Sequence, residues 1–363
     1  MTRPFMTILT LLSLFAFVSG CVADDEPTPV LEPVEPDLVP EMATTAFDSL
    51  VLPDLDALPD MGKEARLWIK HYAQVYANRI SFTPINDGAN HYLYDELDKL
   101  GYETRLIEYG PEAIGSSSPL TYKVIEGRRA GAVEPEKHIG LIAHHDARYS
   151  SNEAAYDDAS GTAVVLALAK YFAEVDTRKS VVALFFDGEE LGLKSSCYYV
   201  NDLARNGGYD YDIAFGYDMV GINWPGHEWG MHLMMGDEDD IPTLLPMAEH
   251  VFRTTYDLPE DGVVILDEHD RNSDERRFRE AGFPIFRWAG GRHAADYPHY
   301  HQPTDTYDTM IDYAGGEENF EQGINAVIQT SIAMFHAADQ WDFPDYTPVE
   351  QECSFYGPDE GPI

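Results

Sequence analysis

Three unbroken apolar runs, at residues 138–144, 180–186 and 213–217, constrain the fold of this chain more than any other feature. Stretches of helical character, at residues 160–173 and 198–203, separate them. Strands without alternating polar residues are typical of a sheet that is covered on both faces, and strands that alternate with helices indicate a parallel arrangement. We therefore predict an α/β protein, a three-layer α/β/α sandwich with a mixed, largely parallel central sheet.

Other periodic segments belong to the same predicted domain. We expect Asp60 to cap an amphipathic helix that continues to Tyr76. Further helices are expected near residues 91–100, 242–255, 274–281 and 323–337, and further strands at 102–109, 121–126 and 284–288. No internal repeat is visible in the sequence, so we predict one folded domain at residues 61–345, followed by a C-terminal tail at 346–363.

Residues 1–20 have the pattern of an export signal. Arg3 precedes an apolar stretch, residues 6–18, that is too short to span a membrane comfortably. The run Val18-Ser19-Gly20-Cys21 resembles the lipobox of bacterial lipoproteins, which predicts a lipid on Cys21. The alternative is an ordinary signal peptide that is cut near Ala23.

An acidic, proline-rich segment at residues 21–60 follows this signal. Its composition buries too little apolar surface to fold alone, so we predict an extended tether. Together, the two segments predict an exported protein that is either anchored to the cell envelope, at the outer membrane, or secreted. Only a lipidated Cys21 would then contact the membrane. Cys197 and Cys353 are the two other cysteines, and the sequence leaves open whether they pair.

The charge of the chain restricts its partners. Its 363 residues include 64 acidic and 24 basic side chains, which gives a formal net charge of −40. Such a charge repels phosphates, so neither nucleic acid nor an anionic lipid surface is an expected partner. Metal cations remain compatible with it, and the positions of the acidic residues become the main question.

Polar residues with metal-binding side chains stand where the predicted strands end. His144-His145-Asp146 ends the first strand, Asp187-Gly188-Glu189-Glu190 the second and Asp218 the third, while Asp157–Gly161 precede a helix and Tyr297–Asp305 lie downstream. Taken singly, such residues are more often turn or capping residues. Together they predict a metal site, because ligands bind beyond the carboxyl ends of strands in α/β sheets.

The same residues resemble the family-28 metallopeptidases, zinc exopeptidases that include secreted bacterial aminopeptidases and the glutaminyl cyclases. The resemblance covers residues 60–340 and implies the zinc-exopeptidase fold. Its motifs are His-x-Asp at His144–Asp146, Asp-Asp-Ala-Ser-Gly at Asp157–Gly161, Glu-Glu-Leu-Gly-Leu at Glu189–Leu193, Asp-Met-Val-Gly at Asp218–Gly221 and Tyr-His-x-Pro-x-Asp at Tyr300–Asp305.

This resemblance implies a role for each matching residue. Two zinc ions would be held by His144, Asp157, Glu190, Asp218 and His301. Asp157 would bridge the two ions, with His144 and Asp218 on one and Glu190 and His301 on the other. Glu189 would be the general base and Asp146 would orient His144. The Asp157–Asp158 peptide bond is expected to be cis. Two imidazoles and three carboxylates suit zinc, although cobalt or manganese fit the same ligands.

Two departures from the family pattern concern the surroundings of the site. Ser273-Asp274-Glu275 stands where many relatives have Ser-Asp-His, and Gln302 stands where threonine is usual. The first affects expected substrate contacts more than metal binding. We expect substrate contacts from Tyr300, Trp224 and Arg292, with Arg287 and His293 as further cations for a substrate carboxylate or the reaction's oxyanion.

The leading hypothesis is a zinc-dependent aminopeptidase that hydrolyses N-terminal peptide bonds of a peptide substrate. A glutaminyl cyclase is the first alternative, and it would use one zinc on Asp157, Glu190 and His301. The Asp-Asp-Ala-Ser-Gly run favours the peptidase, because cyclases usually depart from it after the first Asp. An inactive, lipid-anchored binding protein is the second alternative. The sequence carries no prediction of oligomeric state.

Overall fold

We describe the protein from a computed structural model. The structure describes residues 47, 49–111, 120–222, 232–235, 247–248, 250–251, 264–267, 273–289, 297–344 and 347–353. All of these residues belong to one compact unit, Pro40–Ile363.

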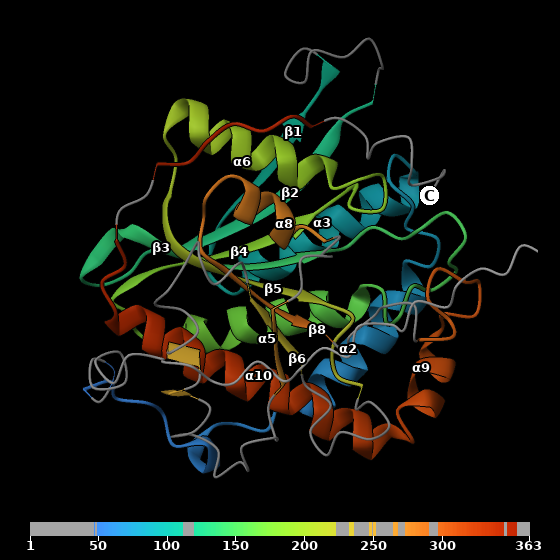
Figure 1. The fold of residues 1–363 in the computed structure, drawn as a ribbon. Helices are drawn as coiled ribbons and strands as arrows, with labels where there is room; N and C mark the ends of the chain where they lie inside the picture. Colours follow the sequence, from blue (N-terminus) through green and yellow to red (C-terminus); the bar gives the residue numbers. More distant parts are fainter. Residues whose placement is uncertain are drawn as a thin grey trace, which may run out of the picture. The chain divides into compact units, whose positions relative to one another are not determined.

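A mixed sheet forms the frame of this unit (Figure 1). Its order within the described residues is β1-β2-β4-β3-β5-β8-β6-β7. The bounds are β1 Glu103–Tyr109, β2 Tyr122–Arg129, β3 Glu134–His144, β4 Lys179–Phe186, β5 Asp210–Asp218, β6 His232–Met235, β7 Val264–Asp267 and β8 Ile285–Ala289. The four central strands β4, β3, β5 and β8 run parallel, and so do β6 and β7, whereas β1–β2, β2–β4 and β6–β8 pair antiparallel.

Helices cover both faces of the sheet, as predicted. One face carries α2 (Gly62–Val75), α3 (Pro84–Lys99), α5 (Ala159–Glu174) and α10 (Glu317–Gln340), and the other carries α6 (Lys194–Asn206) and α8 (Glu275–Glu280). The shorter α9 (Tyr307–Tyr313) packs against α2. The α/β fold with a mixed, largely parallel sheet is therefore confirmed. Parallel central strands place their carboxyl ends at one edge, and this edge positions the site.

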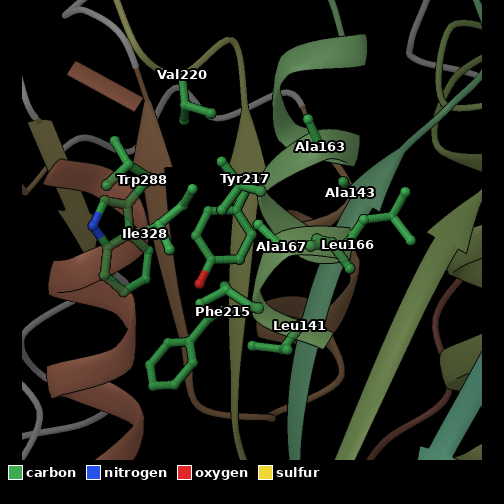
Figure 2. Packing of buried hydrophobic residues seen from close by; sticks show 14 of the residues in the cluster. Leu141, Ala143, Ala163, Leu166, Ala167, Phe215, Tyr217, Val220, Trp288 and Ile328 are labelled. Atoms are coloured by element: carbon green, nitrogen blue, oxygen red, sulfur yellow. The ribbon is translucent and has the colours of Figure 1, made fainter. Parts of the chain in front are cut away.

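The larger hydrophobic core lies between the sheet and α5 (Figure 2). Ala163 and Ala167 of α5 face Leu141 of β3 and Tyr217 of β5, and all four side chains are buried. Small alanines let the helix approach the strands closely, so little space remains between the layers. The loops before and after these elements are consequently held at fixed positions.

Two helices begin at other residues than the sequence predicts. The N-cap of α2 is Met61 instead of Asp60, although the Asp60 carboxylate accepts a hydrogen bond from the Gly62 amide at 3.0 Å. The helix predicted near residues 91–100 is the second half of α3, which begins at Pro84 after the Thr83 cap. Proline at the first helical position needs no hydrogen-bond partner, which explains this earlier start.

The predicted tether at residues 21–60 extends too far. Phe47 is buried and its ring lies 4.5 Å from that of Trp341. A single 3-10 turn, η1 (Leu55–Ala57), follows, and its leucine packs on the larger core with Leu50, Leu52 and Leu58. These recurring apolar side chains distinguish residues 47–60 from the proline-rich part before them.

A disulfide between Cys197 and Cys353 answers the pairing question that the sequence left open. It attaches the end of the chain to α6, and Asn201 of the same helix hydrogen-bonds the Gln351 carbonyl at 2.9 Å. Residues 347–353, part of the predicted tail, are therefore held on the folded unit.

Several predictions fall on residues outside the described part. They concern Cys21, the substrate-contact candidates Trp224, Arg292 and His293, and most of the helix expected at 242–255. Among the described helices, none has both the length and the apolar character needed to cross a membrane.

Candidate metal centre

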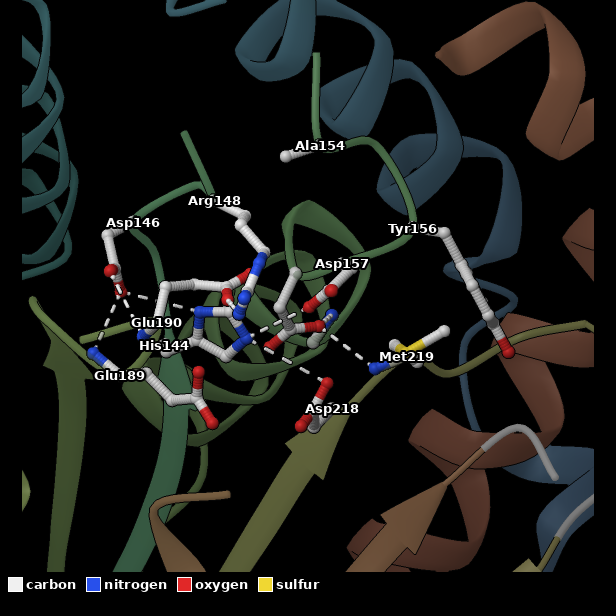
Figure 3. Close-up of polar contacts among 12 residues, drawn as sticks. His144, Asp146, Arg148, Ala154, Tyr156, Asp157, Glu189, Glu190, Asp218 and Met219 are labelled. Atoms are coloured by element: carbon white, nitrogen blue, oxygen red, sulfur yellow. Dashed lines mark hydrogen bonds and ion pairs between the residues drawn. The ribbon is translucent and has the colours of Figure 1, made fainter. Parts of the chain in front are cut away.

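All five predicted ligands meet at the carboxyl edge of the central strands, and Figure 3 shows four of them, His144, Asp157, Glu190 and Asp218. His144 is the last residue of β3 and Asp218 the last of β5, while Glu190 lies in the loop after β4. Asp157 lies in the loop before α5, and His301 lies before α9. Ligands from five separate segments converge because parallel strands end at the same edge.

The five side chains form two groups that share Asp157. His144 Nε2 lies 3.2 Å from Asp157 Oδ1 and 3.8 Å from Asp218 Oδ1. His301 Nε2 lies 3.3 Å from Asp157 Oδ2 and 3.3 Å from Glu190 Oε2. The two oxygens of Asp157 thus face different histidines, which is the arrangement of a carboxylate that bridges two cations.

These groups fit zinc. Zinc–nitrogen and zinc–oxygen bonds of about 2.0–2.1 Å at tetrahedral angles put neighbouring ligand atoms roughly 3.4 Å apart. The separations above, 3.2 to 3.8 Å, bracket this value. Asp157 Oδ2 and Asp218 Oδ1 are also buried without a hydrogen-bond partner. Buried acceptor oxygens normally have a hydrogen-bond partner, so a bound cation is the partner that fits these two oxygens.

Asp146 supports both the histidine and the loop after β4. Its Oδ1 lies 3.5 Å from His144 Nδ1 and accepts from the Glu189 amide at 3.2 Å. Its Oδ2 accepts from the Glu190 amide at 3.3 Å and from Ser81 Oγ at 3.1 Å. Burial raises the pKa of Asp146, but the His144 ring and the Ser81 hydroxyl bring it below its ordinary value. Asp146 is therefore a charged support for one ligand and for the loop with the two glutamates.

The predicted base and its neighbour lie on this tight loop. Glu189 contributes a carboxylate oxygen that lies within 4.8 Å of the ligand atoms of His144 and Asp218. Burial raises the pKa of Glu189 and of Glu190, and adjacent carboxylates raise both further. Carboxylates crowded in this way take up divalent cations in exchange for protons.

Asp158 joins the start of α5 to the chain after β5. The Asp157–Asp158 peptide bond is cis, as the family resemblance implies. The Asp158 side chain caps α5 through the Gly161 amide at 2.8 Å and accepts from the Met219 amide at 3.1 Å. Asp158 therefore has the capping role that is ordinary for such a residue, and it also lies beside the predicted ligands.

Asp305 has a role that sequence reasoning did not assign. Its Oδ1 accepts from the Tyr156 amide and its Oδ2 from the Asp157 amide, each at 3.1 Å. Asp305 is fully buried, and burial followed by the charge of Asp157 raises its pKa to about 7. It connects the segment of His301 to the segment of the bridging ligand. The sequence feature that points to Asp305 is its position as the last residue of the Tyr-His-x-Pro-x-Asp motif.

Two arginines approach the ligands. Arg148 Nη1 lies 3.2 Å from Glu190 Oε2, and Figure 3 shows its side chain over the cluster. Arg287 donates to Asp218 Oδ2 at 2.9 Å and to Glu275 Oε1 at 3.0 Å. Arg287 is buried between two carboxylates, so the expectation that it binds a substrate carboxylate is wrong.

Tyr300 is another predicted substrate contact among the described residues. Its ring stacks on that of His301 with centroids 3.6 Å apart. Burial raises the pKa of Tyr300, and the carboxylates of Asp157 and Glu189 raise it further, so the phenol keeps its proton and remains a donor.

Comparison with known families identifies the family of this chain. The sequence profile of Peptidase family M28 matches residues 124–327, more than half of the chain. The chain belongs to peptidase family M28. The matched region contains every predicted ligand from His144 to His301. Zinc is the metal of this family, in agreement with the ligand geometry above.

Two curated relatives illustrate this membership. Aminopeptidase YwaD of Bacillus subtilis is 28% identical over 179 residues, which cover 47% of this chain and 37% of that protein. Leupeptin-inactivating enzyme 1 of Streptomyces exfoliatus is 30% identical over 201 residues, which cover 53% and 40%. The M28 chain thus spans about two fifths of the length of these relatives.

Solved structures share the fold. BSAP, a zinc aminopeptidase from Bacillus subtilis, has a TM-score of 0.62 at 16% identity and covers 76% of this chain and 95% of its own. The glutaminyl cyclase of Porphyromonas gingivalis has a TM-score of 0.61 at 17% identity, with coverages of 77% and 98%. Peptidases and cyclases resemble this M28 chain equally, so the fold alone does not separate the two activities.

Proposed function

We propose that this M28 peptidase is an aminopeptidase that uses two zinc ions to hydrolyse N-terminal peptide bonds. The observation that carries this proposal is the Asp157 carboxylate, whose oxygens face His144 at 3.2 Å and His301 at 3.3 Å. Asp218 and Glu190 complete the two groups, so each half has its own histidine and its own carboxylate. A second complete group is needed for two-metal hydrolysis and is superfluous for a one-zinc cyclase.

Zinc, when bound, supplies Lewis acidity that lowers the pKa of a water molecule and polarises the scissile carbonyl. We assign the proton transfers to Glu189, which accepts the proton of that water and delivers it to the leaving amine. Its backbone amide is held by Asp146, so the base has a defined position beside His144. We assign hydrogen bonding of the oxyanion to Tyr300, a protonated donor whose ring stacks on that of His301.

Glutaminyl cyclase activity is the second candidate. The group of Asp157, Glu190 and His301 suffices for one zinc, and the solved structure of a glutaminyl cyclase matches this fold as well as an aminopeptidase does. Glu189 would then move a proton within the substrate, from the attacking amine to the departing ammonia, without a water nucleophile.

One experiment separates these functions. The purified protein is analysed for zinc by atomic absorption, then assayed with aminoacyl-nitroanilides and with an N-terminal glutaminyl peptide. We expect two zinc ions per chain and amide hydrolysis. Glu189→Gln should retain zinc and lose about 10²–10⁴-fold in kcat, the usual contribution of a general base. The exposed Glu136→Gln is the matched control and should behave as wild type.

Other outcomes contradict the proposal. One zinc per chain with cyclisation and no hydrolysis supports the cyclase instead. If wild type and Glu189→Gln are equally inactive on both substrates, the binding-protein alternative gains and both catalytic proposals fail.

A further inference from the structure

The buried pair of Arg287 and Glu275 has no assigned role beside the metal centre. Arg287 donates through Nη2 to Asp218 Oδ2 at 2.9 Å and through Nη1 to Glu275 Oε1 at 3.0 Å. All three residues are less than a tenth exposed. A buried guanidinium whose fork joins two carboxylates has a fixed orientation, since each terminal nitrogen is held by a different partner.

The sheet register explains this contact. Arg287 of β8 stands opposite Gly216 of β5, and Asp218 is two residues further along the same strand. Side chains two residues apart point to the same face, so Arg287 reaches Asp218 diagonally. Gly216 has no side chain in between, and a Cβ there would lie 3.3 Å from Cβ of Glu275. The glycine therefore leaves the space that Glu275, at the start of α8, occupies.

Because of this guanidinium, the two oxygens of Asp218 have different surroundings. Oδ2 is occupied by Arg287, whereas Oδ1 lies 3.8 Å from His144 Nε2 and is buried without a hydrogen-bond partner. The hydrogen bond from Arg287 to Oδ2 restricts the orientation of this carboxylate and leaves Oδ1 as the oxygen that faces His144. Hydrogen bonds to ligating carboxylates tune metal affinity in this way.

The second group of ligands is supported differently. Among the described contacts, the cation beside Glu190 is Arg148, at 3.2 Å, and neither Arg287 nor Glu275 contacts Asp157, Glu190 or His301. The two halves of the site thus depend on different arginines. A change at Arg287 should therefore act on one half only.

We propose that Arg287, held by Glu275, is a positioning residue that makes the His144–Asp218 half of the site competent to bind zinc. This inference rests on the proposed two-zinc function. Glu275 stands where the family pattern has histidine in many relatives, and its carboxylate accepts a hydrogen bond from the Nη1 end of the guanidinium. An ion pair with only a structural role would stabilise the fold and leave the two zinc affinities unchanged.

The test compares zinc binding in wild type, Arg287→Met, Arg287→Lys and Glu275→Gln. Metal-free proteins are titrated with zinc in competition with a chromophoric chelator, and with cobalt to follow the absorption of each site. We expect Arg287→Met to bind one zinc as wild type does and to bind the second about 10–100-fold more weakly, the usual effect of losing a group that supports a ligand. Arg287→Lys should restore part of the affinity.

Arg66→Met is the matched control. Arg66 is a buried arginine of α2 paired with Glu317 and Glu321, away from the ligands. We expect it to lower the unfolding temperature and to keep both zinc affinities. If Arg287→Met does not fold, Glu275→Gln and Arg287→Lys test the same point, because they keep most of the side-chain volume.

The outcomes distinguish this inference from the proposed function. Equal zinc affinities in wild type and in all three site variants overturn the role of Arg287 and Glu275. A wild type that binds a single zinc overturns the two-zinc function itself, and the inference falls with it. Equal weakening of both sites also contradicts the inference, since it indicates a general loss of structure.

Discussion

At the scale of single residues, the site depends on carboxylates that divide their two oxygens between different partners. Asp157 faces His144 with one oxygen and His301 with the other, and Asp146 holds two loop amides with separate oxygens. Asp218 is held by Arg287 on one side and is open to a metal on the other. Residue type alone predicts a ligand, whereas these contacts show which partner each oxygen faces.

His138 provides a pH-dependent test at this scale. Its Nε2 accepts from Arg128 Nε at 3.2 Å, and burial together with this guanidinium lowers its pKa to about 4, compared with an ordinary value near 6.5. Between these two values the unfolded chain binds a proton that the folded chain does not, so stability falls as pH falls. From pH 7.5 to 5.0, this group should lower the free energy of unfolding by about 1–3 kcal/mol.

His138→Gln removes this titration. Urea unfolding of the zinc-free protein at pH 7.5 and 5.0 should show a smaller loss of unfolding free energy in the variant than in wild type. His91→Gln, at an exposed position, serves as the control and should lose as much as wild type. Identical pH dependence in His138→Gln and wild type would show that His138 titrates normally in the folded chain.

At the scale of elements, the loops beyond the strands are tied to one another by buried side chains. Asp305 joins the segment before α9 to the segment before α5, and Asp158 joins the start of α5 to the end of β5. Such links join the segments that carry the predicted ligands, although these segments lie far apart in the sequence.

Asp305→Asn tests this link. An amide replaces one of the two acceptor oxygens by a donor, which then faces a backbone amide instead of accepting from it. We expect zinc affinity to fall about 10-fold or more, because the bridging ligand loses its support. Asp308→Asn, an exposed change on α9, is the control for charge removal. Unchanged zinc affinity in Asp305→Asn would exclude a role in metal binding.

The disulfide to α6 is a second test at this scale. Cys197 and Cys353 are 156 residues apart, so the bond restricts a long loop of the unfolded chain. Removing it by Cys197→Ser with Cys353→Ser should lower the free energy of unfolding by about 2–4 kcal/mol. Because the bond lies on α6 and not at the ligands, zinc content should stay the same. A reductant should lower the stability of wild type and leave the double variant unaffected.

At the scale of the whole molecule, the chain carries far more acidic residues than its site uses. Three of the 64 acidic side chains of the full chain, Asp157, Glu190 and Asp218, are the proposed zinc ligands, so most of the charge of −40 lies elsewhere. Such a charge keeps a protein soluble and excludes polyanionic partners. We also propose that the chain is exported and anchored through Cys21, a location in which the disulfide would persist.

A labelling experiment tests this anchor. Expression in a bacterial host with labelled palmitate should give a labelled protein in the membrane fraction. Cys21→Ser should abolish the label and release the protein from the membrane fraction, while the peptidase activity of the soluble form is kept. A wild-type protein that is unlabelled and fully soluble would indicate an ordinary secretory signal.

The sequence by itself determined the fold class and the chemical types of the ligands. Unbroken apolar strands and helical periodicity are local patterns, and short motifs such as Asp157–Gly161 carry their residues at fixed spacing. The predicted end of the tether, at residue 60, lies too far along the chain. The composition of residues 21–60 as a whole hides the apolar residues near its end, from Phe47 onward.

Only the tertiary structure decided which atoms meet. Asp218, Glu275 and Arg287 lie far apart in the sequence, and their contact follows from the pairing of β5 with β8 and the position of α8. The disulfide and the contacts of Asp305 with the segment of the predicted bridging ligand also join residues that lie far apart in the sequence. Distances between remote segments arise from packing of the whole chain, and no local pattern contains them. The sequence therefore suggests Arg287 as a cation for the substrate, whereas in the fold it hydrogen-bonds Asp218 and Glu275.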